Sequence, residues 1–99
     1  MASHFVITHT SHFKSYYKKL SPEDQAAIDN TIEAVVLYKQ TGSAPFGLRI
    51  KQLRPKIYEA RVDISTRLVF YADKNAVRFI ALGNHDDILR TLKQIDKLS

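Results

Sequence analysis

The sequence has no cysteine, which excludes several kinds of chemistry at once. A chain without thiols cannot form a disulfide, use a cysteine nucleophile or bind a metal through thiolates. The sequence also lacks a glycine-rich phosphate loop, a Ser/His/Asp order and any zinc-ligand spacing. The core must therefore be held by packing or by a partner protein, and no cofactor is expected.

Long hydrophobic runs are missing as well. No stretch approaches the roughly 20 apolar residues that span a bilayer, and the first residues, MASHF, lack the basic-then-apolar layout of a secretory signal. We therefore expect a cytoplasmic protein with no membrane partner. The chain has 99 residues, of which 44% are hydrophobic, which suffices for one compact core. Residues 1–99 are expected to form a single domain.

Acidic residues are in deficit, with ten Asp and Glu against fifteen Lys and Arg. The resulting net charge of +5 favours encounters with phosphates, an acidic protein or an anionic membrane, and charge alone does not choose among them. The basic residues are not massed in a tail but spread through segments that otherwise look folded. This distribution indicates a shaped basic surface.

The first half of the chain predicts one strand and two helices. Residues 4–9 are apolar and β-branched, which is typical of a short strand. A helical period begins at Ser11, with apolar and aromatic residues on one face. Ser21 then supplies an N-cap and Pro22 the first position of a second helix, which runs to about Gln40. We expect the two helices to form an antiparallel hairpin.

The second half predicts four strands, at residues 48–53, 57–63, 66–72 and 77–82, followed by a helix at residues 87–97. The short connections between these strands permit hairpins but not parallel crossovers. The expected architecture is an α+β fold of order βααββββα, in which the N-terminal strand and helical hairpin pack on a four-stranded antiparallel meander.

The central hairpin predicts which residues share a face of the sheet. If Tyr58, Ala60 and Val62 join Leu68 and Phe70 in the core, Val62 lies opposite Leu68 and Ala60 opposite Phe70. Residues at the intervening positions, with two from the preceding strand, then occupy the reverse face: Arg49, Lys51, Glu59, Arg61 and Arg67. The sheet is expected to have one apolar side and one cationic side.

The cationic side suits a polyphosphate ligand, because guanidinium groups bind phosphate oxygens bidentately and stay charged. A plain solvated strand face, with Arg61 paired to Glu59 or Asp63, is the alternative for any single residue. His85 lies in the break before the last helix, where it can project toward Arg67 and transfer a proton during phosphodiester cleavage. A loop residue that caps the helix with Asp86 and Asp87 is the alternative, and spacing alone favours it.

The other histidines and the aromatic residues indicate structure rather than chemistry. His4 and His9 have opposite parity on a strand and would face away from each other, so a metal site formed by His4, His9 and His12 is not expected. Tyr16 and Tyr17 could stack RNA bases, but with Phe13 they have the spacing of a helix core.

Three stretches of the sequence, in this order, resemble the RelE/ParE toxin superfamily over nearly the whole chain. They are the strand at residues 53–62 (LRPKIYEARV), the strand at residues 66–71 (TRLVFY) and the strand end at residues 83–87 (GNHDD). The most specific features are the tyrosine-acid-x-arginine strand, the arginine-leucine-valine-phenylalanine-tyrosine strand and the glycine-x-histidine-aspartate end.

The resemblance implies a toxin of a type II toxin-antitoxin system, bound by a cognate antitoxin. In the RelE branch it also implies an endoribonuclease, an mRNA interferase that cuts mRNA in the ribosomal A site without a metal. Arg67 matches the family's arginine at the scissile phosphate, while Arg61 and His85 match positions that hold basic or imidazole groups. These three residues are the expected catalytic set. The expected RNA-binding set is Arg49, Lys51, Arg54, Glu59 and Asp86.

Two departures from the family pattern leave other functions open. Many ribosome-dependent members carry an aromatic residue shortly after the histidine position, where this chain has Ile88 or Leu89. Asp86 and Asp87 temper the positive charge nearby, although they could orient the His85 imidazole. The alternatives are a ParE-like toxin that binds DNA gyrase and a toxin-like binding module without catalytic activity.

Overall fold

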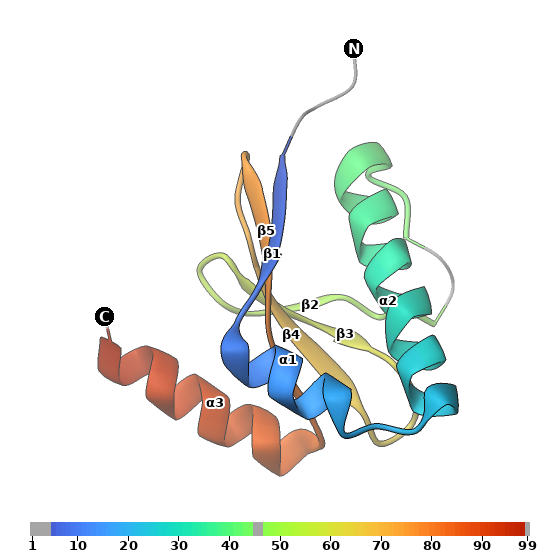
Figure 1. The fold of residues 1–99 in the computed structure, drawn as a ribbon. Coiled ribbons are helices and arrows are strands. Elements are labelled where there is room, and N and C mark those ends of the chain that lie inside the picture. The colour runs from blue at the N-terminus through green and yellow to red at the C-terminus, as the bar shows by residue number, and fades with distance from the viewer. Residues whose placement is uncertain (1–4, 45–46, 99) are drawn as a thin grey trace.

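The computed structural model describes residues 5–44 and 47–98 and shows a five-stranded sheet flanked by three helices (Figure 1). The elements follow the predicted α+β order: β1 (Val6–His9), α1 (Ser11–Lys18), α2 (Pro22–Thr41), β2 (Lys51–Arg54), β3 (Ile57–Arg61), β4 (Arg67–Ala72), β5 (Ala76–Gly83) and α3 (His85–Leu98). Within the described residues, no helix is both long and apolar enough to cross a membrane.

The spatial order of the strands is β1-β5-β4-β3-β2. Strands β2 to β5 form the antiparallel meander expected from their short connections. β1 pairs with β5 in parallel, and the chain crosses from one to the other through the two helices and the meander. β1 and β2 are therefore the two edge strands.

The predicted faces of the central hairpin are correct, but the predicted register is wrong by two residues. Ala60 pairs with Leu68 and Tyr58 with Phe70. The cause is the tight turn at Asp63, whose carboxylate accepts hydrogen bonds from the backbone N–H groups of Ser65 (2.9 Å) and Thr66 (2.8 Å). This turn closes the hairpin sooner than expected, because aspartate side chains mimic a backbone turn.

Helices α1 and α2 cover one face of the sheet and diverge from the turn that joins them (Figure 1). Thr10 and Ser21 cap the two helices, and Gly42 ends α2 in the left-handed conformation with φ of 78°. The two helices contribute Phe13, Ile28 and Val35 to the main core cluster. The remaining buried members of this cluster are Leu48, Ala60, Leu68, Phe70, Val77, Phe79 and Leu82. Tyr16 and Tyr17 pack against it, as their helical spacing predicted.

Helix α3 packs on the reverse face, which corrects the prediction of a wholly cationic side. Ile88 and Leu92 of α3 form a second buried cluster with Ile57 and Val69 of the sheet. This cluster occupies one half of the reverse face and leaves the basic residues to the other half. The sheet is thus covered by helices on both sides, and Arg61 and Arg67 at the ends of β3 and β4 remain partly exposed.

Some boundaries differ from those predicted. The second strand begins at Lys51 rather than Leu48, because Arg49 adopts a left-handed φ of 47° that interrupts the extended chain. The first strand begins at Val6, and the predicted residue His4 lies outside the described residues. α3 begins at His85, two residues earlier than predicted. His85 is therefore in the first turn of a helix and not in a loop.

Candidate active site

The three predicted catalytic residues lie at one end of the sheet, on its reverse face. Arg61 at the end of β3 pairs directly with Arg67 at the start of β4, and Arg67 pairs with Gly83 at the end of β5. Directly paired residues in an antiparallel sheet have Cα atoms only about 4.5–5.5 Å apart. His85 follows Gly83 by two positions and opens α3. The register thus brings together residues that are far apart in the sequence.

A buried carboxylate holds one of the two arginines. The Arg67 Nη1 donates to the Glu59 Oε2 at 3.0 Å, and the Glu59 side chain is only 8% exposed against 28% for Arg67. Two positive charges opposite each other on neighbouring strands repel, and a nearby carboxylate offsets that repulsion. Glu59 therefore sits beneath the arginine, where it fixes the guanidinium and leaves its other edge toward solvent.

Arg61 is less constrained than Arg67. Its Nε is buried without a hydrogen-bond partner among the described residues, and it forms no ion pair with Glu59 or Asp63. The residue also borders an open hollow of about 410 Å³ between α2 and the start of the meander, lined further by Ala27, Asn30, Thr31, Ala34, Gly47, Leu48 and Val62. A half-buried guanidinium with an unmet donor is suited to bind an anionic group.

His85 is exposed, and the capping role considered for it belongs to its neighbour. The Asn84 side chain accepts from the Asp87 backbone N–H (3.0 Å), and the Asp87 carboxylate accepts from the Asn84 backbone N–H (3.0 Å). This reciprocal pair closes the start of α3 and leaves the His85 imidazole unengaged by the described part of the chain. The orientation of His85 by Asp87 is therefore not seen.

Hydrogen bonds and an ion pair stabilise the charged form of the Asp87 carboxyl. The Asn84 backbone N–H, and after it Arg90, keep the pKa of the Asp87 carboxyl below its usual range despite partial burial, with a smaller contribution from His12 on α1. Arg90 of α3 forms an ion pair with the same carboxylate. Asp87 is thus a structural acid at the start of α3.

The predicted RNA-binding residues are not all brought to this end of the sheet. Lys51 is exposed and pairs across the strands with Glu59, next to the arginines. Arg54 pairs with Ile57, four residues and therefore about 13 Å along β3 from Arg61. Its guanidinium binds Asp96 of α3 through Nε and Nη2, both at 3.1 Å. Arg54 thus ties β2 to α3 instead of facing the arginine pair.

The remaining members of that set differ in exposure. Arg49 and Asp86 are both exposed, and Asp86 lies in the first turn of α3 beside His85. Glu59 is buried, so it acts through Arg67 and does not itself reach the surface where RNA would lie. The basic surface is therefore smaller than the predicted cationic side of the sheet, and Arg61, Arg67 and Lys51 form its centre.

A histidine considered as a metal ligand and a tyrosine considered for stacking on RNA bases both make structural contacts. The His9 ring packs at a tilt of 50° against the Phe13 ring with centroids 6.0 Å apart, and the Tyr17 hydroxyl donates to Asp29 at 2.8 Å. That hydrogen bond to Asp29 raises the pKa of Tyr17 above its ordinary value. Among residues 5–44 and 47–98, no group of three or more His, Asp or Glu is arranged to hold a metal ion.

Sequence reasoning missed two residues that shape the site. A Cβ at Gly83 would overlap the Asp87 side chain, so only glycine lets the first turn of α3 lie over the end of β5. Asn84 starts the helix as its cap. The signal for the second was present, because an Asn followed three residues later by an acid is typical of a helix start.

Arg61, Arg67 and His85 together can perform only a few kinds of chemical step. The guanidinium groups of two directly paired residues can bind phosphate oxygens, and an imidazole can act as a general acid or base during phosphodiester cleavage. The chain has no thiol, and the hydroxyl groups of Ser65 and Thr66, which directly precede Arg67, are hydrogen-bonded to the Asp63 carboxylate. The site is therefore suited to binding a phosphodiester and stabilising charge on it while the attacking group comes from the substrate.

Comparisons with known proteins identify the fold. No protein-family model matches the sequence, and no curated protein matches it significantly. Solved structures match well: YafQ from E. coli (TM-score 0.67, 17% identity, 83% of this chain and 94% of that chain) and the YoeB dimer from Staphylococcus aureus (TM-score 0.65, 17% identity, 82% and 97%).

The RelB-RelE antitoxin-toxin complex from Methanococcus jannaschii is also similar (TM-score 0.62, 15% identity, 85% of this chain and 96% of that chain). This chain therefore has the RelE-like toxin fold, as its sequence predicted. At such low identities the likeness establishes the fold, and the function has to be argued from the site.

Proposed function

We propose that this RelE-like chain is the toxin of a type II toxin-antitoxin system and cuts mRNA on the ribosome. The pairing of Arg61 with Arg67 beside His85, in a fold shared with a toxin solved in complex with its antitoxin, is the observation that supports this proposal. The cytoplasm is the compartment in which such a protein meets ribosomes, and a cognate antitoxin is its expected partner.

The attacking group in this mechanism belongs to the RNA. The ribose 2′-hydroxyl gives up its proton and attacks the adjacent phosphate, the bond from phosphorus to the 5′-oxygen of the next nucleotide breaks, and that oxygen takes up a proton. The protein therefore has to orient the chain, stabilise charge and move these two protons. Arg67 and Arg61 hold the phosphate oxygens, and the charge that develops on those oxygens strengthens both contacts. His85 is the proton-transfer group, because its imidazole is exposed at this end of the sheet and an imidazole can act as a general acid or base.

Glu59 makes the arginine pair effective by positioning it. Its hydrogen bond to one Nη of Arg67 fixes the plane of the guanidinium, so that fewer rotamers have to be lost when a phosphate binds. The carboxylate also offsets part of the repulsion between the two arginines in the absence of RNA. Glu59 is a positioning residue and not a catalytic one, because Arg67 stands between it and the substrate.

The missing aromatic residue has a structural explanation. Ile88 is 2% exposed and belongs to the buried cluster under α3, while Leu89 is 45% exposed. Neither residue can transfer a proton, so His85 carries the acid and base steps that a hydroxyl-bearing aromatic could otherwise share. Leu89 can still contact a base through its apolar surface.

The experiment that tests this function is to induce the chain from a tightly controlled promoter and to map the 5′ ends of cellular mRNA. Growth arrest with new cuts inside translated frames is the expected result for the native chain. The same experiment is run with Arg67→Lys and His85→Ala variants, in which we expect the cuts to weaken by about 10²-fold for the arginine, as for loss of one charge-stabilising donor.

Other outcomes would point elsewhere. Arrest with gyrase-linked DNA damage and no cuts in mRNA would replace this proposal with a gyrase-binding toxin. A folded, soluble product that neither arrests growth nor cuts RNA would leave an inactive binding module. Thermal unfolding of each variant, compared with the native chain, separates loss of the site from loss of the fold.

A further inference from the structure

The turn between β3 and β4 carries the most exposed large apolar side chain of the described residues. Ile64 is 92% exposed, against 63% for Val6, which ranks next. The turn joins Arg61, the last residue of β3, to Arg67, the first residue of β4, and Ile64 lies three residues from each. Three residues span at most about 11 Å of extended chain. Ile64 is therefore close to the arginine pair of the candidate site.

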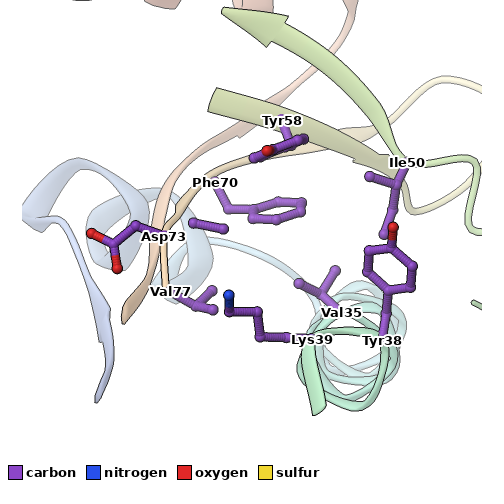
Figure 2. A pocket seen from close by; sticks show the side chains of 9 residues that line it. Val35, Tyr38, Lys39, Ile50, Tyr58, Phe70, Asp73 and Val77 are labelled. Atoms are coloured by element: carbon purple, nitrogen blue, oxygen red, sulfur yellow. The ribbon is translucent and has the colours of Figure 1, made fainter. Parts of the chain in front are cut away.

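Apolar side chains of the adjoining sheet lie in the core, in contrast to Ile64. Val35 of α2, Phe70 of β4 and Val77 of β5 line one cavity on the helix-covered face (Figure 2), and all three are buried. Ile64 takes no part in this core or in the cluster under α3. Single exposed apolar residues are common on protein surfaces. Exposure alone therefore assigns no role to Ile64.

The turn holds the backbone around Ile64 in a defined shape. The Asp63 carboxylate accepts hydrogen bonds from the backbone N–H groups of Ser65 (2.9 Å) and Thr66 (2.8 Å). The Thr66 carbonyl accepts from the backbone N–H of Val62 (2.9 Å). Glycine, asparagine, aspartate and serine dominate tight turns, whereas β-branched residues are favoured in strands. An isoleucine that neither suits the turn nor contributes to the core breaks a local rule, as residues at functional positions do.

The helices leave Ile64 uncovered. The other four residues of the turn line a hollow of about 270 Å³ against α1 and α2: Val62, Asp63, Ser65 and Thr66. Ile64 is not among the residues that line this hollow, so its side chain lies outside it. The apolar surface of Ile64 is therefore accessible to a ligand that is bound at the arginines.

The charges around the turn favour a nucleic acid over a protein as this ligand. Arg61 and Arg67 flank the turn, and the carboxylate of its one acid, Asp63, is engaged by backbone N–H groups within the turn. A nucleotide joins a flat base, against which an apolar side chain can pack, to a phosphate that guanidinium groups bind. An apolar patch of a protein has no anion fixed beside it in this way. RNA therefore matches both properties of this end of the sheet.

We propose that Ile64 is a wedge that packs against a base beside the scissile phosphate and opens the stack between the two nucleotides that flank it. This inference rests on the proposed function, because it concerns the RNA held by Arg61 and Arg67. The 2′-oxygen attacks in line with the bond to the leaving 5′-oxygen, and two regularly stacked nucleotides do not hold these atoms in line. Apolar side chains that insert between bases unstack them. Ile64 therefore acts on the rate of cutting more than on the affinity for RNA.

The test measures base stacking directly with 2-aminopurine, a base whose fluorescence rises when it is unstacked. The probe is a ribosome programmed with an mRNA that carries 2-aminopurine in the A-site codon, at each codon position in turn. In one version of this mRNA, 2′-deoxynucleotides in the codon prevent cutting, and in the other version ribonucleotides allow it. We expect the native chain to raise the fluorescence of the deoxy version at one of the positions and to cut the ribonucleotide version.

Three variants make the assignment specific. Ile64→Ala should lose most of the rise in fluorescence and slow single-turnover cutting by about tenfold, while its affinity for the programmed ribosome changes by less than about twofold. Ile64→Leu keeps a similar apolar volume and should stay within about threefold of the native rate. Leu37→Ala removes another exposed apolar side chain, from α2, and is the matched control that should behave as the native chain does. Urea denaturation should show all three variants folded.

The outcomes separate the wedge from the ribonuclease function. Unchanged fluorescence and rate in Ile64→Ala would overturn the wedge, and so would a loss of affinity with an unchanged rate, which would assign Ile64 to a contact with a protein. If the native chain cuts mRNA but leaves the base stacked, the wedge alone is wrong. If Ile64 unstacks the base and mRNA is not cut, the ribonuclease function alone is wrong. A native chain that does neither would overturn both.

Discussion

Along β3 and β4, residues of the hydrophobic core are direct sequence neighbours of residues of the candidate site. On one face Ala60 and Leu68 are 0% exposed beneath α1 and α2. On the other, Arg61 and Arg67 are partly exposed and form the centre of the candidate site. Because strand residues alternate between faces, a change of one position separates the core from the chemistry. Paired substitutions at adjacent residues can therefore test each face alone.

The reverse face of the sheet has an apolar half and a cationic half, and the candidate site lies in the cationic half. Ile57 and Val69 pack with Ile88 and Leu92 of α3, whereas Arg61 and Arg67 are not part of that cluster and pair at the other end of β3 and β4. The apolar half gives α3 a surface to bury, and the cationic half stays open because no apolar residue there attracts a helix. α3 thus delivers His85 to the border between the two halves.

The largest expected effect is on the core face, through Leu68→Ala. Deleting a fully buried leucine side chain leaves a cavity, and we expect the free energy of unfolding to fall by about 2–5 kcal/mol. Urea denaturation measures this directly. Ile64→Ala is the matched control, because Ile64 is 92% exposed, and its change should stay within about 0.5 kcal/mol. Similar losses at both positions would contradict the assigned core.

The second prediction concerns the adjacent residue on the other face. Arg67→Lys keeps a positive charge beside Glu59 but removes the planar fork that binds phosphate bidentately. We expect mRNA cutting to fall by about 10²-fold while the free energy of unfolding changes by less than about 1 kcal/mol. Arg78→Lys on β5, an exposed position outside the arginine pair, is the control and should cut normally.

Arg67→Ala would be a poorer choice, because it leaves the buried Glu59 carboxylate without its partner. An uncompensated buried charge destabilises a fold by about 3–5 kcal/mol. That variant would therefore combine a loss of stability with the loss of the phosphate-binding guanidinium, and the two effects would not be separated. If Arg67→Lys were to lose as much stability as Leu68→Ala, the separation of the faces would be wrong.

A third prediction sharpens the role of Glu59. Glu59→Gln keeps the shape and an acceptor for Arg67 but removes the charge that holds the guanidinium. We expect cutting to slow by about tenfold because Arg67 is less well oriented. Binding of RNA should not weaken, since the surface becomes more positive. Single-turnover kinetics measure the rate of cutting, and a separate assay measures the affinity for RNA. A loss of affinity equal to the loss of rate would contradict a positioning role.

The sequence predicted the fold well where local signals agreed with the tertiary contacts. Ser21 and Pro22 marked the start of α2 correctly, and alternation in β3 and β4 identified the right faces. The register failed because it depended on the Asp63 turn, whose side-chain hydrogen bonds no periodicity reveals. The site residues Arg61, Arg67 and His85 could be proposed from the resemblance, but the buried state of Glu59 and the pairing of Arg54 with Asp96 required three-dimensional contacts.

The smallest expected effect is at the border between the faces, where Asp87 holds the start of α3. Hydrogen bonding by the Asn84 N–H, followed by Arg90, lowers the folded-state pKa of Asp87. The charged form therefore contributes stability above the unfolded pKa of about 3.9, and that contribution is lost as pH falls through the lower folded pKa. Asp87→Asn, which keeps an acceptor for Asn84 but removes the charge, should cost about 0.5–1 kcal/mol near pH 6.

The pH dependence separates this effect from a simple packing loss. As pH falls below the unfolded pKa of about 3.9 and then through the lower folded pKa, the native carboxyl takes up a proton and the difference between the native chain and Asp87→Asn should shrink toward zero. Urea denaturation of both proteins above and below these pKa values measures it, and the other acids with lowered pKa, Asp63 and Asp73, cancel because both proteins contain them. A difference that stayed constant with pH would mean that Asp87 holds α3 by its shape, and then the Asn84 pair rather than the charge would fix the position of His85.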